Sequence, residues 1–544
     1  MEPTVTQDHG ILYECFQKVR RHFYTQIDPH IHAAAYRTTD QKWYAEPEFA
    51  GKYLDLCAYY AQSEQNAQAL ANGQIVTAAI LSHQRADGYL GCLAPGMERV
   101  NFSVWNHSFT LYGLTRMYEA THDRALLTAA EKAADWLLHT FANCAEPDIL
   151  CALNQGSQHL CSIFAMAYLH RVTQNPAYAD YIRRILAYCE TTNMNLLSFD
   201  DILHLRSKKG IEMLVIYLGV LAFGVQTNDA RAISAARRYF TQVDQTQIRN
   251  TGNATIGEFF TENGNAPRFL PTEEKPNETC VAVGFMELAL ALFFAEPNAQ
   301  FLCALEKTLY NHLLGSFDRE GKDFAYYQGN YGKKIFQTEK GAYRCCRYRG
   351  FTIFSYLKSY LYHTDGTTIT PLLYTPSVYT SDALTLTQET DYPRTDTVSF
   401  TAICQTPHTL RLFLPAWCRS YTLQINQTPV SLSPSAGFLS LPLPKGKTAV
   451  SLRFAMPLER QDCIIDGTPY VSFSRGPLLL ALDTHFGNRL TDPVQPNAPV
   501  QSDPPGTDCL VHERIGNLHL IDYASAGSLS PAQDEYTVFL RKEP

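Results

Sequence analysis

The sequence has no Lys/Arg-rich run and no Gly-rich phosphate loop, and charged residues of either sign are scarce. They make up 18% of the 544 residues, with 53 Asp and Glu against 45 Lys and Arg and a formal net charge of −8. Nucleic-acid binding depends on clustered positive charge that neutralises phosphates. We therefore expect no nucleic-acid partner.

Long hydrophobic runs and a secretion signal are lacking as well. No stretch approaches eighteen uninterrupted apolar residues, and the polar Met1–Gly10 segment has no basic start followed by an apolar core. Membrane spans and signal peptides need those features. We expect no membrane partner and a cytoplasmic location. There the 15 cysteines, an odd number, would remain free thiols rather than form a disulfide framework.

The first two thirds of the chain show helical periodicity. A chain of 544 residues exceeds the usual size of a single core, so at least two domains are expected. Apolar positions at helical spacing predict about twelve helices, at 11–24, 47–62, 65–84, 104–121, 125–142, 157–173, 177–190, 209–225, 229–246, 279–294, 298–315 and 347–362. They group into six antiparallel hairpins, whose second helices start near Asp or Asn. This pattern favours an (α/α)6 barrel, a toroid with a central cavity, and a looser helical array is the alternative.

The periodicity changes to strict alternation after Gly366. Short alternating segments separated by turn residues, such as 397–403 and 409–414, are typical of β-sandwiches. A second break near Asp466-Gly467 divides this part. The predicted domains are a catalytic barrel over 1–364, a β-sandwich over 365–465 and a second, C-terminal β domain over 466–544.

Three cysteines and a glutamate stand out as candidate metal ligands. Cys345 and Cys346 are adjacent, and Glu278-Thr279-Cys280 precedes them by some sixty residues. Both segments adjoin apolar helical patterns, which places the thiols at helix starts, where the helix dipole favours thiolate. Soft thiolates select zinc, and a bound cation deprotonates its thiol ligands. The alternative is that these are buried structural cysteines.

The Glu-x-Cys segment followed by an apolar helix, with the cysteine pair downstream, resembles the β-L-arabinofuranosidase family of glycoside hydrolases, glycoside hydrolase family 127 and its relatives. The resemblance covers most of the chain. Further segments that echo the family are 49–55, 87–90, 118–121 and 475–477.

The resemblance implies a retaining glycosidase that contains zinc. Exo-action on short oligosaccharides is expected from the missing secretion signal, because a cytoplasmic enzyme meets imported fragments rather than polymers. The resemblance places Glu278, Cys280 and Cys346 as zinc ligands, together with Cys345, whose thiolate would also be the nucleophile. A carboxylic acid/base is implied ahead of Glu-x-Cys in a Gly-Glu-x-Phe setting, which Glu258 fits best. Glu262 is the second candidate, because it lies closer to the usual distance from Leu270-Pro271.

The resemblance also points to sugar-contacting histidines and to two departures from the family. His107 and His159, each opening a helix, resemble the sugar-binding histidines, although histidines at helix starts are often caps or core residues. Lys208-Lys209 replaces a usual histidine and would favour an anionic sugar if it reached the pocket; a solvated loop is the more ordinary interpretation. Arg347–Gly350 replaces an Asn-containing loop after the cysteine pair.

The expected function is release of β-L-arabinofuranose or a related sugar from oligosaccharides. Three alternatives stay open: a glycosidase or lyase with a carboxylate pair and structural zinc, a sugar-binding protein without chemistry, and an epimerase that would use histidines as proton carriers. The exact sugar and linkage are not determined by the sequence. The oligomeric state is open too, with a homodimer through the β domains as one arrangement.

Overall fold

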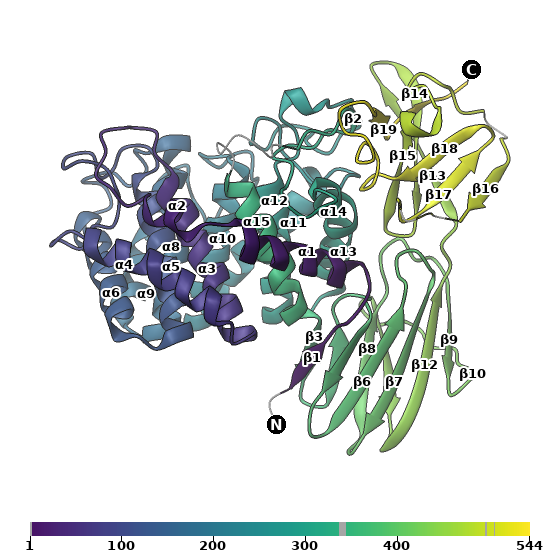
Figure 1. Ribbon diagram of the computed structural model, residues 1–544, viewed down its shortest axis with the longest axis horizontal. Helices are drawn as coiled ribbons and strands as arrows, with labels where there is room; N and C mark the ends of the chain where they lie inside the picture. Colours follow the sequence, from purple (N-terminus) through teal and green to yellow (C-terminus); the bar gives the residue numbers. More distant parts are fainter. Residues whose placement is uncertain (1–2, 337–343, 496–497, 505, 507, 544) are drawn as a thin grey trace.

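The N-terminal part of the chain is built of helices, which lie beside the sheets (Figure 1). The computed structural model describes residues 3–336, 344–495, 498–504, 506 and 508–543. Within these residues, six inner helices contact one another in sequence, and the last contacts the first. They are α3 (Glu46–Ser63), α5 (Ser103–Thr121), α8 (Ser162–Thr173), α10 (Gly210–Thr227), α12 (Thr279–Ala295) and α15 (Arg344–Leu357).

Each inner helix packs against one outer helix. The outer helices are α1 (Ile11–Gln26), α4 (Ala67–His83), α6 (Arg124–Thr140), α9 (Pro176–Cys189), α11 (Ala230–Thr246) and α13 (Ala299–Lys307). Because α1 packs on α15, the first and last helices of the domain form the pair that closes the ring. The predicted (α/α)6 barrel is confirmed.

Short helices connect these elements. They are α2 (Pro29–Ala33), η1 (Leu153–Gly156), α7 (Ser157–Leu160), η2 (Thr272–Glu274), η3 (Thr308–Leu313), α14 (Leu314–Ser316), η4 (Lys358–Tyr360) and, near the C-terminus, η5 (Thr484–Phe486).

Inner and outer helices differ in the sequence signal at their starts. The outer helices α4, α6, α9, α11 and α13 begin after Asn66, Asp123, Asn175, Asp229 and Asn298, whose side chains accept hydrogen bonds from backbone N–H groups of the first turn. Such caps satisfy donors that a helix leaves unpaired. The inner helices α3, α5, α8, α10 and α12 have no side-chain cap of this kind.

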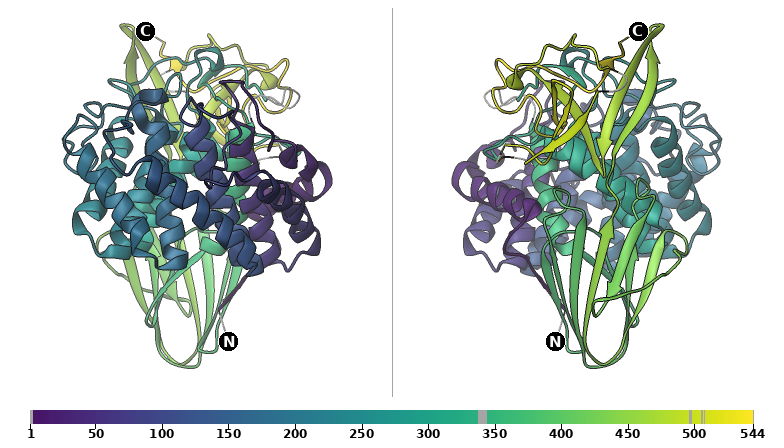
Figure 2. Two further views of the ribbon diagram at one scale, coloured as in Figure 1. Left: turned by 90° about the vertical axis from the view of Figure 1, so that its left-hand side faces the viewer. Right: turned by 90° about the vertical axis from the view of Figure 1, so that its right-hand side faces the viewer.

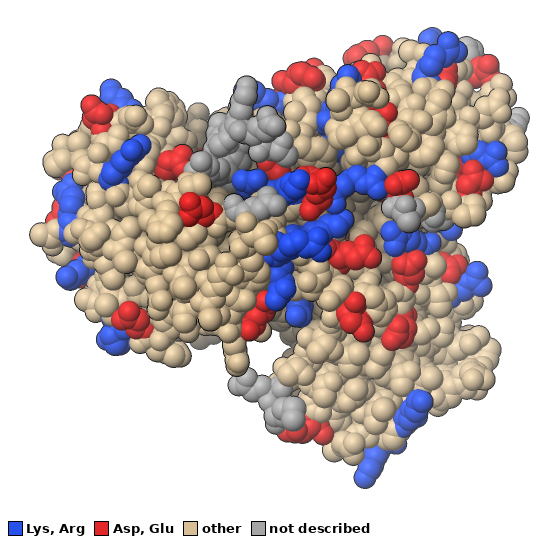
Figure 3. Space-filling model, in the orientation of Figure 1, with Lys and Arg blue, Asp and Glu red and all other residues tan. Residues whose placement is uncertain are grey.

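The inner helices α10 and α12 are strongly apolar, and most of their residues are buried. α10 is long and apolar enough to cross a membrane by length and composition, yet 72% of that segment is buried inside the protein. Its burial identifies it as a core helix. The surface in Figure 3 carries acidic and basic side chains side by side along the junction between the helices and the sheets.

Three sheets follow the ring, and they lie on one side of it, as the two end views in Figure 2 show. The first sheet has the order β1-β5-β6-β7-β12-β9-β10 and the second β11-β8-β4-β3. Buried side chains from both, such as Val398 and Leu410, share one core, which makes the pair a sandwich. The strands are β1 (Thr4–Thr6), β5 (Ser377–Thr380), β6 (Leu384–Thr390), β7 (Thr397–Cys404), β12 (Gly446–Phe454), β9 (Tyr421–Ile425), β10 (Thr428–Pro429), β11 (Phe438–Leu443), β8 (His408–Phe413), β4 (Thr368–Pro371) and β3 (Tyr362–Asp365).

The third sheet forms the C-terminal part. Its main path is β13-β14-β15-β18-β17-β16, and β2, β19 and β20 pair beside it. The strands are β13 (Leu458–Ile465), β14 (Thr468–Arg475), β15 (Leu478–Asp483), β18 (Leu518–Asp522), β17 (His512–Ile515), β16 (Val500–Asp503), β2 (Tyr331–Gly332), β19 (Tyr536–Thr537) and β20 (Leu540–Arg541).

Strand pairing corrects the domain boundaries drawn from the sequence. The boundary at 465/466 falls inside the β13–β14 hairpin, so the change of sheet comes between the end of β12 at Phe454 and Leu458. The boundary at 364/365 likewise falls within β3. In addition, β1 pairs with β5 and β2 with β19, so two segments assigned to the barrel belong to sheets. Long-range pairing of this kind leaves no local sequence signal.

A buried carboxyl group joins the ring to the sandwich. Glu306 of α13 accepts hydrogen bonds from the Tyr392 hydroxyl at 2.5 Å and the Trp417 indole N–H at 3.0 Å. Burial raises the pKa of Glu306 to about 7, although both hydrogen bonds act in the opposite direction. The side chain is 2% exposed, so the charged form is disfavoured in the folded protein.

We expect Glu306→Gln to remove part of the pH dependence of stability. The pKa of Glu306 in the folded protein exceeds its value of about 4.5 in the unfolded chain. Its contribution to the free energy of unfolding is therefore fully present below about pH 4.5 and is lost as pH rises through about 7. The loss of stability amounts to about 3 kcal/mol at higher pH. Glutamine mimics the protonated acid, so the variant should melt above the wild type at pH 8 but not at pH 5.

Thermal unfolding of both proteins across this pH range measures the difference. Glu389→Gln, at an exposed position on β6, is the matched control and should follow the wild type. Parallel pH profiles of the melting temperature for wild type and Glu306→Gln would contradict the prediction, because they would show that Glu306 is ionised in the folded protein throughout this pH range.

Candidate functional site

The predicted metal ligands converge. The ligand atoms of Glu278, Cys280, Cys345 and Cys346 all lie within 4.8 Å of one another. The Cys280 and Cys345 sulfurs are 3.1 Å apart, the Cys345 and Cys346 sulfurs 3.9 Å, and Cys346 Sγ is 4.0 Å from Glu278 Oε1. A disulfide bond is about 2.05 Å long, and all fifteen cysteines are free. The four residues thus form a candidate metal site.

The local structure explains why Glu278 faces the thiols. Glu278 precedes the first residue of α12, a position where a carboxylate ordinarily caps the helix, but its side chain makes no capping hydrogen bond. It is 1% exposed, and Oε2 has no hydrogen-bond partner within the described part of the chain. A buried carboxylate oxygen without a partner is costly. Burial raises the pKa of Glu278 to about 8.

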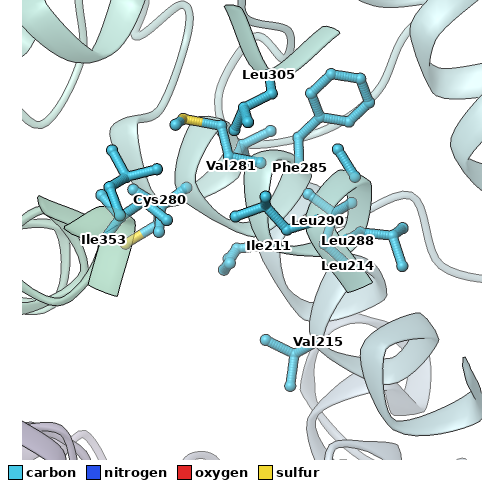
Figure 4. Packing of buried hydrophobic residues seen from close by; sticks show 14 of the residues in the cluster. Ile211, Leu214, Val215, Cys280, Val281, Phe285, Leu288, Leu290, Leu305 and Ile353 are labelled. Carbon is cyan, nitrogen blue, oxygen red and sulfur yellow. The ribbon is translucent and has the colours of Figure 1, made fainter. Parts of the chain in front are cut away.

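Packing fixes the two cysteine-bearing helices relative to each other. Cys280 is the second residue of α12 and is fully buried, among side chains that include Ile353 of α15 (Figure 4). On another side, α12 packs on α10 through Leu214. Cys345 and Cys346 lie at the start of the described part of α15. Cysteines from adjacent inner helices therefore meet at one end of the ring.

The three thiols differ in acidity. The pKa of Cys345 lies well below its ordinary value, because hydrogen bonds from Cys280 and Cys346 stabilise its thiolate and the Lys52 ammonium and Tyr326 hydroxyl add to this. Burial raises the pKa of both Cys280 and Cys346. Cys345 is also the half-buried member of the three, while the other two are buried. It is the thiol best suited to act as a nucleophile.

A buried ion pair on α3 faces the thiols. Lys52 Nζ lies 2.5 Å from Glu48 Oε1, with side-chain exposures of 5% and 7%. Burial alone would lower the pKa of Lys52, but Glu48 and the sulfurs of Cys345 and Cys280 raise it. Lys52 therefore stays charged beside the cluster. A third inner helix thus supplies positive charge that stabilises the Cys345 thiolate.

Glu258 lies at the tip of a tight turn. Ile256 and Phe259 exchange backbone hydrogen bonds of 3.0 and 3.1 Å, and the two residues between them, Gly257 and Glu258, have φ of 54° and 77°. Two successive positive φ values match a type I′ turn, which strains a glutamate. The Gly210 N–H donates to the Glu258 carbonyl at 2.9 Å, holding the turn against the start of α10. Strain of this kind is typical of functional positions.

Two adjacent tyrosines connect Glu258 with the cysteine cluster. The Tyr327 hydroxyl donates to Glu258 Oε1, and the backbone of Tyr327 pairs with that of Glu278. Tyr326 contacts Cys345 through its hydroxyl, and the two tyrosine rings lie 4.5 Å apart. Neither tyrosine was identified from the sequence, where 32 tyrosines occur mostly in apolar patterns. The adjacent pair Tyr326-Tyr327 was the available signal.

Lys209 reaches the site, contrary to the expectation of a solvated loop. Its ammonium forms an ion pair with Glu258 Oε2, and its side chain is 11% exposed. It also lies 5.5 Å from the centre of the Phe259 ring. The backbones of Lys209 and Phe259 pair, which places the lysine beside the turn of Glu258. The sequence could not show this contact, because the two segments are far apart along the chain.

The segment after the cysteine pair is helical. Arg347–Gly350 continues α15, so it forms no loop at the site. Arg347 donates to the Lys322 carbonyl at 3.2 and 3.0 Å, the Tyr348 hydroxyl lies 2.6 Å from His32 Nε2, and Arg349 pairs with Glu287. These contacts anchor α15 in the ring.

His107 and His159 do not join the cluster. Leu90 N–H donates to His107 Nδ1 at 3.1 Å, and His107 Nε2 bonds the Ala133 carbonyl at 2.9 Å. The His159 nitrogens lie 3.1 and 3.3 Å from the carbonyls of Ile149 and Arg99. Burial lowers the pKa of both imidazoles to about 4. Both histidines are core residues in this structure, with their ring nitrogens directed at the backbone rather than at a cavity.

Glu262, the alternative acid/base, is exposed in a turn four residues after Glu258. Among the described residues no contact links it to the cysteines. The geometry favours Glu258, which Tyr327 connects to the segment of Glu278.

Comparisons with known proteins identify the family to which the chain belongs. A family model described as the GH127 catalytic domain of β-L-arabinofuranosidase matches residues 7–359, and one for the GH127 middle domain matches residues 368–456. The non-reducing end β-L-arabinofuranosidase of Bifidobacterium longum is 23% identical over 521 residues, 84% of this chain and 76% of that protein.

Solved structures show the same fold. A GH127 β-L-arabinofuranosidase from Geobacillus stearothermophilus T6 superposes with a TM-score of 0.79 at 17% identity, covering 99% of this chain and 100% of that one. A second GH127 β-arabinofuranosidase gives a TM-score of 0.81 at 17% identity, covering 99% and 96%. The chain belongs to the GH127 β-L-arabinofuranosidase family and is a glycoside hydrolase.

Proposed function

We propose that this chain is an exo-acting retaining glycosidase that releases β-L-arabinofuranose or a related sugar from oligosaccharides. Cys345 is the nucleophile and Glu258 the acid/base. Glu278, Cys280, Cys345 and Cys346 hold one zinc ion. The observation that carries the proposal is the convergence of these four side chains at two inner helices, with a buried carboxylate oxygen that has no hydrogen-bond partner among the described residues.

The donor set fits zinc on chemical grounds. Three sulfurs and one carboxylate are ligands that zinc accepts, and four protein ligands complete a tetrahedral site. Oε2 of Glu278 has no hydrogen-bond partner among the described residues, a costly feature that a cation would relieve. When bound, zinc would keep the sulfur of Cys345 deprotonated and make it a better leaving group.

The chain's own residues divide the remaining chemistry. Cys345 attacks the anomeric carbon, while Glu258 gives its proton to the departing oxygen; Glu258 then takes a proton from the water that releases the sugar. Lys209 and Tyr327 each contact one carboxylate oxygen of Glu258. Together they fix the direction of the carboxyl group, which a side chain on a surface turn would otherwise sample freely.

Lys209 supports the second half of the reaction, in which Glu258 acts as a base. Its ammonium favours the charged form of Glu258, the form needed when Glu258 acts as a base. The Tyr327 hydroxyl can donate to that carboxylate and accept from the protonated acid, so it supports both states. Lys209 is thereby engaged with Glu258, which argues against its assignment as the receptor of an anionic sugar.

The proposed sugar rests on family membership and on the name of the curated relative, a non-reducing end β-L-arabinofuranosidase. We expect para-nitrophenyl β-L-arabinofuranoside to give the highest kcat/KM in a screen of pentosides, hexosides and one carboxylated sugar. NMR of the first product should show the substrate's anomeric configuration, as a retaining mechanism requires.

The same screen separates the alternatives. A first product of inverted anomeric configuration would contradict the assignment of Cys345 as the nucleophile. No release from any glycoside, by protein whose fold is intact, would favour a sugar-binding protein.

A further inference from the structure

A second group of metal-ligand side chains lies on the C-terminal sheet, away from the cysteine cluster. Ligand atoms of Asp503, His512 and His519 lie within 4.8 Å of one another. His512 Nε2 and His519 Nδ1 are 3.0 Å apart. The three residues come from the adjacent strands β16, β17 and β18.

Strand register places these side chains on one face. Asp503 is paired directly with His512, and His519 is paired with Arg514, two residues after His512. Because side chains alternate along a strand, all four point to the same side of the sheet. Glu513 and Ile515, between them, are buried on the opposite side. The tight turn at Gly516-Asn517 fixes this register by joining Ile515 to Leu518.

The imidazoles are held before any ion binds. The Phe486 ring lies 4.9 Å from the His512 ring and 6.2 Å from the His519 ring, and covers both. All three potential ligands are half-buried.

Arg514 is the group that competes for Asp503. Its Nε lies 2.8 Å from Oδ2, and its Nη2 donates to Oδ1 at 3.1 Å. The Gln501 amide also approaches Oδ1, at 3.3 Å. Metal-binding carboxylates are commonly hydrogen-bonded by such outer groups, which orient them, and each oxygen keeps a further lone pair. The ion pair therefore orients the Asp503 carboxylate and offsets part of its negative charge, and it leaves a lone pair on each oxygen available to a metal ion.

We propose that Asp503, His512 and His519 bind a divalent transition-metal ion, such as zinc, at a site separate from the catalytic cluster. Two imidazole nitrogens on one ion, each about 2.0–2.1 Å from it, lie about 2.9 Å apart at a right angle and about 3.3 Å apart at the tetrahedral angle. The 3.0 Å separation of the two nitrogens falls between these values. Two histidines and one carboxylate suit zinc, iron, cobalt or nickel, not magnesium or calcium.

The ion would stabilise the edge strand β16 of the third sheet. β16 is the last strand on the main path of the third sheet and pairs with β17 alone. Val500, at its start, is 54% exposed. An ion shared by β16, β17 and β18 would hold this strand in place and raise stability in proportion to the logarithm of ion concentration.

The test uses the full chain, stripped of metal with a chelator and titrated with Co²⁺ or Zn²⁺ alone. Thiolate ligands give Co²⁺ an intense near-ultraviolet charge-transfer band, whereas histidine and carboxylate ligands give only weak visible bands. We expect His512→Asn and His519→Asn each to lose one equivalent of bound metal and its thermal stabilisation, while the charge-transfer band and glycoside hydrolysis are unchanged. Asp503→Asn should weaken binding about tenfold or more.

His408→Asn is the matched control, since His408 is a half-buried histidine outside the group, and its Nδ1 bonds a nearby backbone carbonyl at 2.7 Å. Equal metal content in the wild type and in both histidine variants would overturn the proposal. So would variants that melt at lower temperature but bind Zn²⁺ as the wild type does, because the histidine pair would then share a proton and not an ion. Cys346→Ser should show the reverse pattern, with the charge-transfer band weakened and the second site retained.

Discussion

Cys345→Ala is expected to lower kcat on an aryl β-L-arabinofuranoside by roughly 10⁴-fold or more, because a retaining glycosidase without its nucleophile has no route to the covalent intermediate. Cys345 has the most acidic thiol of the cluster, since Cys280, Cys346, Lys52 and Tyr326 all stabilise its thiolate. Steady-state rates on the variant and the wild type give the comparison. Unfolding temperature and circular dichroism establish that the ring is intact.

Two controls separate this role from general loss of a thiol. Cys151→Ala removes an exposed cysteine outside the cluster and should leave kcat within about twofold of the wild type. Added azide should restore part of the rate of Cys345→Ala and give a glycosyl azide of inverted configuration, because a small anion can occupy the space of the missing sulfur. Turnover of Cys345→Ala within about tenfold of the wild type would assign the chemistry to another group.

The helices could be predicted because their signal is local. Apolar spacing located every inner and outer helix, and capping residues such as Asp123 and Asp229 marked where outer helices begin. Ring closure by α1 on α15 and the entry of β1 into the first sheet depend on residues more than three hundred positions apart. Nothing in either segment alone indicates its partner.

The residues of the candidate site also divide into those that the sequence indicates and those that only the structure reveals. Glu278, Cys280, Cys345 and Cys346 could be found because the Glu-x-Cys segment and the downstream cysteine pair together resemble the family, whereas a cysteine pair alone is weak evidence. Tyr327 and Lys209 could not, since tyrosine is common in cores and lysine is ordinarily solvated. Their role depends on a strained turn, 256–259, that brings Glu258 between them. His107 and His159 illustrate the opposite error, in which a helix-start histidine serves the core.

Glu258→Gln is expected to lower kcat by about 10²–10⁴-fold on natural-type substrates, whose leaving groups need a proton. The loss should be much smaller for the first step with an activated leaving group such as dinitrophenol, which departs without protonation. Release of the enzyme-bound sugar would then be slow, because no base activates water. Burst kinetics and partial rescue by azide, this time with retained configuration, measure both effects.

The choice between Glu258 and Glu262 follows from the same experiment. Glu262→Gln changes an exposed carboxylate in the neighbouring turn and should leave kcat unchanged, whereas a large loss in that variant with none in Glu258→Gln would exchange the two roles.

Lys209→Met and Tyr327→Phe test how Lys209 and Tyr327 orient the Glu258 carboxylate. Each removes a contact to one carboxylate oxygen, so each should lower kcat more than it changes KM. Since Lys209 favours the charged carboxylate, its loss should slow the step in which Glu258 is the base more than the step in which it is the acid.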